Sequence, residues 1–325
     1  MANYCPSSRP RTRECSRAPN RSADLHAKPS YGYEMSIVLQ YVLSGLAIGG
    51  IYALVALGFH IMWAAARAVN FAHGDTLMLG AVLAVLGMDA GLPLPVACIL
   101  SIAASCLFGI LLERFAVRPF NESSASIGWM LTTIAVGIML ESLVTMKFGG
   151  FSRALPSPGV DRPISILGAG IYPQELAIPV FAVLTMAGLR LLQTRTLVGR
   201  AMQAVAFNRQ AAALMGIDVN AIVSLSFAMA ATLGGAAGIL IAPVIQASAT
   251  MGLIFGLKGF AVAIIGGITS AAGVVFAGLI FGVIEKFVEG YISTAAREIV
   301  GFSLMIIVLL AFPQGLFGKR EIFKV

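Results

Sequence analysis

The sequence predicts an all-α integral membrane protein, a polytopic bundle of helices, and three observations support this fold class. Hydrophobic residues make up 58% of the 325 residues and charged residues only 11%, whereas a soluble domain carries about 25% charged residues. Mean hydropathy is +0.89. The apolar residues also gather into long runs separated by short polar segments. No soluble core hides this much apolar surface, so the excess is expected to face lipid.

Each apolar run is a candidate crossing, because about 20 helical residues span the hydrocarbon core of a bilayer. The 8 apolar runs are 36–66, 76–91, 92–112, 127–146, 176–192, 219–245, 253–284 and 299–312. The runs 36–66 and 253–284 are too long for one crossing. Glycine and polar residues follow the first run and interrupt the second, which predicts broken helices buried within protein.

Positive charge predicts which segments face the cytoplasm. Segment 190–217 contains four arginines and no acidic residue, so it is expected to be cytoplasmic. The basic N-terminal segment and the basic C-terminal end are expected on the same side. Splitting both long runs makes these placements consistent, so we expect ten crossings with both termini in the cytoplasm.

Residues 1–34 differ from the rest of the chain, being rich in Arg, Ser and Pro with no apolar period. We expect a disordered basic extension here, followed by a single transmembrane domain over 35–325. Met35 is a candidate for the physiological start, and a targeting arm is the alternative. A signal peptide is not indicated, because the first apolar run exceeds signal length and no cleavage site follows it.

Residues with catalytic or metal-binding chemistry are scarce. The histidines and cysteines lack metal-ligand spacing, and no nucleophile–base pair is visible, so we expect neither an enzyme nor a cofactor in this chain. No G-x-x-x-x-G-K-[ST] phosphate loop occurs, so any ATP-driven work belongs to another subunit. The basic residues flank apolar runs, so a nucleic-acid partner is not indicated.

A basic, helix-prone segment, 194–217, separates two apolar runs and is too polar to span. Asn208 is expected to cap a short alanine-rich helix that begins at Arg209. Gly216 stands where a left-handed residue closes a helix. Such an element, which also carries Arg195 and Arg200, suits docking into a groove of a soluble partner. An interfacial helix lying on anionic lipid is the alternative.

Several stretches, in order along 35–325, together resemble a known family. The segment from Asn208 to Ile217 resembles the cytoplasmic coupling loop of binding-protein-dependent ABC permeases. N-F-A-H-G-D at 70–75 resembles the signature of branched-chain amino acid permeases of the LivH type. Further similarity lies in E-R-F-A-V-R-P at 113–119, G-L-K-G-F-A at 256–261, G-G-I-T-S at 266–270 and P-Q-G-L-F-G at 313–318.

This resemblance implies a permease subunit of an importer in the bacterial inner membrane, with a fold like that of type II importers. It implies a second, LivM-like permease subunit, two cytoplasmic ATPase subunits that bind ATP and Mg, and an extracytoplasmic solute-binding protein. Segment 194–217 would then dock onto the ATPase. The implied cargo is branched-chain amino acids. Urea, short amides, nucleosides or sugars are alternatives within the class, and an ion-coupled secondary transporter is the rival from another class.

Polar residues at membrane depth are the candidates for the pathway or its gate. Asn70, His73 and Asp75 lie close together in an apolar setting, and the alternative is a hydrogen-bond network that caps a broken helix. Glu141 is the deepest acid of its run, and it either faces the pathway or pairs with a base. Lys258 is expected at the membrane interface, and contact with a substrate carboxylate is the alternative.

Overall fold

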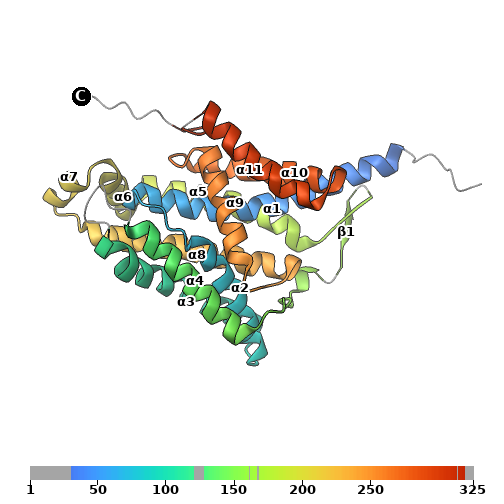
Figure 1. Cartoon of the computed structure of the whole chain (residues 1–325), viewed down its shortest axis with the longest axis horizontal. Helices are drawn as coiled ribbons and strands as arrows, with labels where there is room; N and C mark the ends of the chain where they lie inside the picture. The colour runs from blue at the N-terminus through green and yellow to red at the C-terminus, as the bar shows by residue number, and fades with distance from the viewer. Residues whose placement is uncertain (1–30, 121–127, 161, 167, 313, 319–325) are drawn as a thin grey trace, which may run out of the picture.

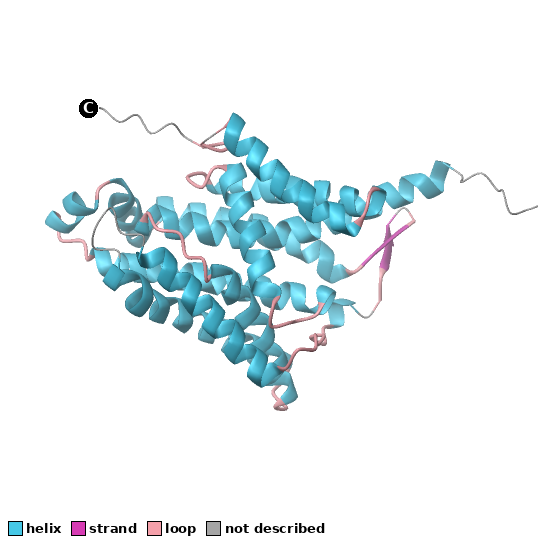
Figure 2. Cartoon of the chain, viewed as in Figure 1, coloured by secondary structure: helices cyan, strands magenta, loops and turns pink. Residues whose placement is uncertain are grey.

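The computed structural model describes residues 31–120, 128–160, 162–166, 168–312 and 314–318, which form a bundle of helices (Figures 1 and 2). The α-helices are α1 (Tyr31–Ala66), α2 (His73–Asp89), α3 (Leu94–Leu112), α4 (Gly128–Phe148), α5 (Pro173–Arg195), α6 (Leu197–Phe207), α7 (Arg209–Leu214), α8 (Val219–Ile245), α9 (Met251–Gly266), α10 (Ala271–Tyr291) and α11 (Thr294–Ala311). Short helical turns are η1 (Glu113–Val117), η2 (Arg118–Phe120) and η3 (Pro158–Val160). Strands β1 (Ile164–Ile166) and β2 (Ala169–Ile171) form an antiparallel hairpin.

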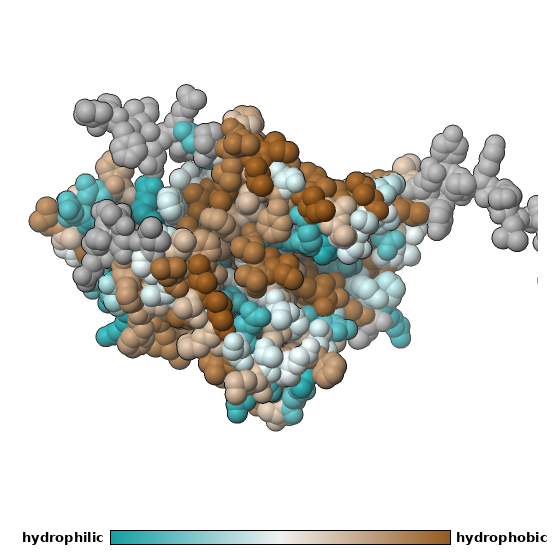
Figure 3. All heavy atoms as spheres, in the orientation of Figure 1, coloured by the Kyte–Doolittle hydropathy of each residue, from teal (hydrophilic) through white to brown (hydrophobic). Residues whose placement is uncertain are grey.

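The predicted membrane bundle is confirmed, because 7 of the described helices are long and apolar enough to cross a membrane. The most hydrophobic window of α1 is 72% buried, whereas that of α11 is only 11% buried. Helix α1 therefore lies at the centre, and α3, α4, α5 and α11 lie at the periphery. Apolar side chains cover much of the visible face in Figure 3, as expected of a surface solvated by lipid.

The predicted break within 253–284 is confirmed. Helix α9 ends at Gly266, and Gly267 follows with a φ of +85°. The Ser270 side chain then accepts a hydrogen bond from the Gly273 N–H and so caps α10. Without a Cβ, Gly267 adopts this left-handed conformation without steric strain.

The predicted split of 36–66 is wrong, because α1 is one continuous helix of 36 residues. At 1.5 Å per residue it is about 54 Å long, so its ends extend beyond a hydrocarbon core of about 30 Å. The interruption instead follows α1, over residues 67–72, and it separates α1 from the shorter α2. Parity therefore no longer supports ten crossings, and the number of crossings stays a prediction.

The two ends of α1 lie at opposite ends of the bundle. Ser36 near its start contacts Gly168 of the hairpin, and α1 runs from there to α6 and α7 (Figure 1). The placement of both termini in the cytoplasm stays a prediction. Residues 31–34 of the predicted extension are helical. Residues 1–30 and the basic C-terminal residues 319–325 lie outside the described residues.

Glycines hold α1 against α10, in the most extensive helix contact of the fold. A Cβ at Gly49 would lie 2.6 Å from the Gly278 carbonyl oxygen, and one at Gly45 would lie 2.7 Å from the Val283 Cα. Gly278 would in turn meet Ala53. Small residues let helix backbones approach closely where lipid offers no hydrophobic preference between apolar neighbours.

The segment between α1 and α2 turns back into the bundle. Arg67 adopts a left-handed φ of +49° directly after α1, and His73 at the start of α2 packs against Gly58 and Phe59. Helix α2 therefore starts beside the body of α1 rather than beyond its end. This turn brings Phe71 and Asp75 into the interior.

Candidate functional site

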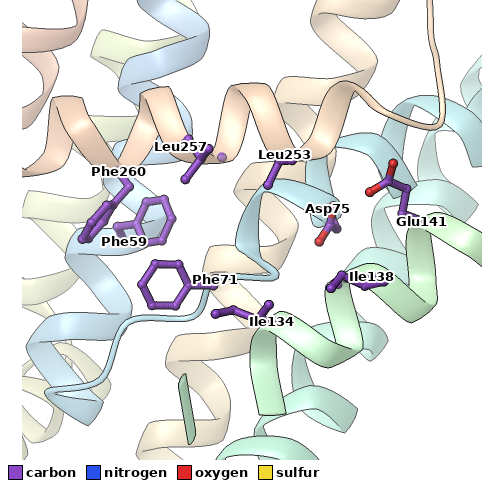
Figure 4. Close-up of a pocket in the computed structure, with 11 residues that line it drawn as sticks. Phe59, Phe71, Asp75, Ile134, Ile138, Glu141, Leu253, Leu257 and Phe260 are labelled. Carbon is purple, nitrogen blue, oxygen red and sulfur yellow. The ribbon is translucent and has the colours of Figure 1, made fainter. Parts of the chain in front are cut away.

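A pocket of about 340 Å³ lies between α1, α2, α4 and α9 (Figure 4). Its lining residues are Phe59, Phe71, Asp75, Ile134, Gly137, Ile138, Glu141, Leu253, Gly256, Leu257 and Phe260. Aromatic rings form one end, with the Phe59 and Phe260 centroids 5.4 Å apart and those of Phe71 and Phe260 5.8 Å apart. Asp75 and Glu141 lie at the other end (Figure 4). The pocket thus combines an apolar chamber with two carboxyl groups.

Asp75 lies in a narrow space between α4 and α9, where it is 7% exposed. A Cβ at Gly137 would lie 2.5 Å from its Oδ2 atom, and a Cβ at Gly252 would lie 3.0 Å from its Cα. Glu141 is partly buried on α4 and near enough for the two carboxyl groups to repel each other. No described residue donates a hydrogen bond or forms an ion pair to either carboxyl group. This end of the pocket therefore presents acceptors without a cation.

Asn70 and His73 lie beside the pocket, outside its lining. The Asn70 side chain accepts a hydrogen bond from the Ala72 N–H at 3.0 Å, and its carbonyl oxygen accepts from the His73 N–H. His73 is fully buried, and its Nε2 donates to the Val55 carbonyl oxygen at 3.1 Å. These contacts match the alternative of a network that caps a broken helix.

Lys258 is buried among α9, α10 and α11 rather than exposed at the surface of the bundle. It is 2% exposed and forms ion pairs with Glu285 of α10 at 2.5 Å and Glu298 of α11 at 2.8 Å. The Tyr52 hydroxyl donates to Glu285 at 2.7 Å. Two neighbouring helices supply the counter-charges, so the ammonium group is stabilised inside the bundle and is not among the pocket-lining groups.

The candidates in 194–217 form a separate group, at the end of the bundle where α6 and α7 lie (Figure 1). The Asn208 side chain accepts from the Ala211 N–H at 3.0 Å, which confirms the predicted cap. Gly216 has a φ of +83°, and the N–H groups of Gly216 and Ile217 donate to the carbonyls of Ala213 and Ala212. This double hydrogen bond closes α7 as the sequence predicts.

The α6–α7 tip, residues 197–216, exposes apolar side chains as well as charge. Phe207 is 93% exposed and Leu214 is 90% exposed. Arg195 and Arg200 are exposed, whereas Arg209 is half-buried and points inward, donating to the Ala65 carbonyl oxygen at 3.2 Å. Burial lowers the pKa of the Arg209 guanidinium, and the nearby Glu113 carboxylate opposes this shift.

Sequence reasoning missed most of the pocket wall. Phe71, Gly256, Leu257 and Phe260 all lie within stretches that carry the family resemblance, so a signal existed for them. The other pocket-lining residues of α4, apart from Glu141, have no such signal in the sequence. An apolar helix that faces lipid and an apolar helix that lines a pocket have the same composition. In the part of the chain that the structure describes, no group of His, Cys, Asp or Glu could hold a metal ion.

Comparisons with known proteins agree on one family. The family model described as "Branched-chain amino acid transport system / permease component" matches residues 41–309. The high-affinity branched-chain amino acid transport system permease protein LivH of Escherichia coli (strain K12) is 31% identical over 301 residues, covering 88% of this chain and 97% of that protein. BraD of Pseudomonas aeruginosa, with the same description, is 33% identical over 306 residues, covering 88% and 98%.

Among solved structures, a chain of PsaBC from Streptococcus pneumoniae in complex with Fab is similar, with a TM-score of 0.47 and 11% sequence identity. The match covers 85% of this chain and 92% of that one.

Proposed function

Because the chain belongs to the family of branched-chain amino acid transport permease components, we propose that it carries leucine, isoleucine and valine through the pocket between α1, α2, α4 and α9. The observation that carries this proposal is the pairing of an apolar chamber with two carboxyl groups that lack a described cation. It is a multi-pass membrane protein, and the membrane is the bacterial inner membrane.

The chemistry of the pocket fits an aliphatic amino acid. Burying a leucine-sized side chain among Phe71, Leu257 and Phe260 stabilises the bound state by about 1.5–3 kcal/mol. The ammonium group of the solute supplies a cationic partner for Asp75 and Glu141. A hydrogen bond between charged groups is stronger than one between neutral groups. Urea or a short amide would leave most of the apolar wall in contact with water.

The driving force comes from partner subunits. Two cytoplasmic ATPase subunits bind ATP and Mg, a second permease subunit completes the membrane part, and an extracytoplasmic binding protein delivers the solute. The chain itself catalyses no reaction. The exposed Phe207 and Leu214 on the α6–α7 tip support docking onto an ATPase, since exposed apolar groups on a helical tip suit a groove of a partner.

This docking implies an orientation. With the α6–α7 tip in the cytoplasm, the start of α1 and the hairpin lie on the extracytoplasmic side, and α11 ends on the cytoplasmic side. The binding protein would then approach the hairpin side of the bundle.

The test is uptake by the complete complex in proteoliposomes, with radiolabelled leucine or urea and with or without ATP. We expect Asp75→Asn to lower leucine uptake roughly 10- to 100-fold, because it removes a charge-assisted hydrogen bond. Asp89→Asn is the matched control, since Asp89 belongs to the same helix but is exposed and paired with Arg153.

Unchanged leucine uptake in the Asp75→Asn complex would contradict the pocket assignment. Uptake of urea in preference to leucine would contradict the substrate. Uptake by the chain alone, driven by an ion gradient without ATP, would favour the secondary transporter instead.

A further inference from the structure

The end of α1 is joined to α6 and α7 by two arginines. The Arg209 Nη2 atom at the start of α7 donates to the Ala65 carbonyl oxygen, at 3.2 Å. In the other direction, the Arg67 Nη2 atom just after α1 donates to the Ala206 carbonyl oxygen of α6, at 3.4 Å. The last carbonyls of a helix lack partners within the helix and carry its negative dipole end. The Arg209 guanidinium therefore binds the C-terminal end of α1, and the Arg67 guanidinium binds the C-terminal end of α6.

Arg209 is well placed to move together with α7. It is the first residue of that helix, which begins after the Asn208 cap and is closed by Gly216. Its side chain is half-buried, with Glu113 near it on the inner side. The guanidinium is therefore fixed against the protein interior rather than surrounded by solvent.

The end of α1 leads directly to the pocket. Arg67 is in the left-handed region, so the chain reverses there and enters segment 67–72. Within this segment the Phe71 N–H donates to the Thr133 hydroxyl of α4, at 3.4 Å. The Phe71 ring forms part of the pocket wall, and Asp75 follows on the first turn of α2.

We infer that Arg209 and Arg67 are positioning residues that transmit displacement of the α6–α7 tip to segment 67–75 and so change the shape of the pocket. The inference rests on the proposed function, and it names the residues through which ATPase movement reaches the solute. Arg195 at the end of α5 and Arg200 on the tip have exposed side chains that form no hydrogen bond to a helix end among the described residues, so they do not share this role.

The experiment uses the complete complex in proteoliposomes. The variants are Arg209→Met, Arg209→Lys and Arg67→Met, with Arg190→Met as the control because Arg190 is exposed on α5, outside the tip. Two quantities are measured: the leucine taken up per ATP hydrolysed, and the thiol labelling of a Leu257→Cys variant. Leu257 is 39% exposed at the pocket. The native cysteines are replaced by serine, and labelling is compared without nucleotide and after trapping with ATP and vanadate.

We expect Arg209→Met to keep the ATPase subunits bound and hydrolysing ATP, while leucine uptake per ATP falls roughly 5- to 20-fold. Nucleotide should then no longer change the labelling of Leu257→Cys. Arg209→Lys should restore part of the coupling, because it retains a cationic donor, and Arg190→Met should behave like the unsubstituted complex. Arg67→Met should lower uptake per ATP as well, which keeps the test independent of whether Arg209→Met folds.

Normal uptake per ATP with nucleotide-dependent labelling in both Arg209→Met and Arg67→Met would overturn the inference. Loss of the ATPase subunits from the Arg209→Met complex would also overturn it, because Arg209 would then act in docking. These outcomes leave the proposed function intact. An unsubstituted complex that fails to take up leucine would overturn the proposed function, and the inference with it.

Discussion

The Asp75 carboxyl group lies directly against Gly137 of α4, so that a Cβ at position 137 would be 2.5 Å from the Asp75 Oδ2 atom. Gly252 of α9 faces Asp75 from another helix in the same way. The acid is thus held between two backbones that approach closely because neither carries a side chain. Its position in the pocket depends on both glycines.

Gly137→Ala should lower leucine uptake while the protein still folds. The added methyl group displaces the Asp75 side chain, and overpacking of this kind costs about 1–3 kcal/mol. Gly188→Ala is the control, because a Cβ there meets nothing within 4 Å. If Asp75 is the group displaced, Gly137→Ala should destabilise an Asp75→Ala protein much less, as a thermal-unfolding cycle in detergent would report. Equal costs in both backgrounds would contradict this contact.

Lys258→Met should destabilise the bundle strongly. It leaves the Glu285 carboxylate buried without its ion pair, and breaking a buried pair costs about 3–5 kcal/mol. Lys286→Met is the control, since the Lys286–Glu289 pair is partly exposed and such pairs contribute at most about 1 kcal/mol. Thermal unfolding of the detergent-solubilised variants measures both. Similar stability of the two variants would argue against a buried charge at 258.

Gly49→Ala should separate α1 from α10. The new Cβ would lie 2.6 Å from the Gly278 carbonyl oxygen, and a backbone atom cannot turn aside as a side chain does. We expect the free energy of unfolding to fall by about 1–3 kcal/mol, with Gly188→Ala as the control. Because α1 also carries Phe59 of the pocket, leucine uptake should fall too. If Gly49→Ala were as stable as the control, α1 and α10 would accommodate the added methyl group, and this prediction would be wrong.

Gly216→Val should weaken the end of α7. Its φ of +83° is strained for a β-branched residue, at a cost of about 1–2 kcal/mol. Gly216→Asn should be milder, because asparagine visits the left-handed region more readily. Nothing lies within 4 Å of a Cβ at this position, so any difference reflects backbone conformation alone. ATP-driven leucine uptake should be highest with glycine at position 216, lower with asparagine and lowest with valine. Equal uptake by all three proteins would contradict a role for the left-handed residue that ends α7.

Some of the pocket-lining residues could be predicted from the sequence alone. Asp75 and Glu141 were predicted as pathway candidates from their depth alone, and both line the pocket. Asn70 and His73 were predicted on the same ground, yet they bond to neighbouring backbone and stay outside the lining. Depth in an apolar run identifies a polar residue that needs a partner, but it does not say whether that partner is the protein's own backbone or a solute. Their roles in transport stay predictions.

Features that depend on local chemistry can be predicted from the amino-acid sequence. Apolar run length predicted the membrane helices, and the run 219–245 coincides with α8. Capping chemistry predicted the beginning and end of α7, and glycine and serine predicted the break between α9 and α10. Each of these follows from residues within a few turns of one another, where spacing and side-chain type are sufficient.

Which helix faces meet is visible in the folded protein and not in the sequence. The tertiary structure left α1 unbroken, paired Lys258 with Glu285 and Glu298, and brought Asp75 against Gly137. It also joined Arg209 to the end of α1. These contacts connect residues far apart in the chain, and a lipid-exposed helix has the same apolar composition as a buried one. The arrangement therefore depends on how closely small residues let particular backbones approach, which no single segment specifies.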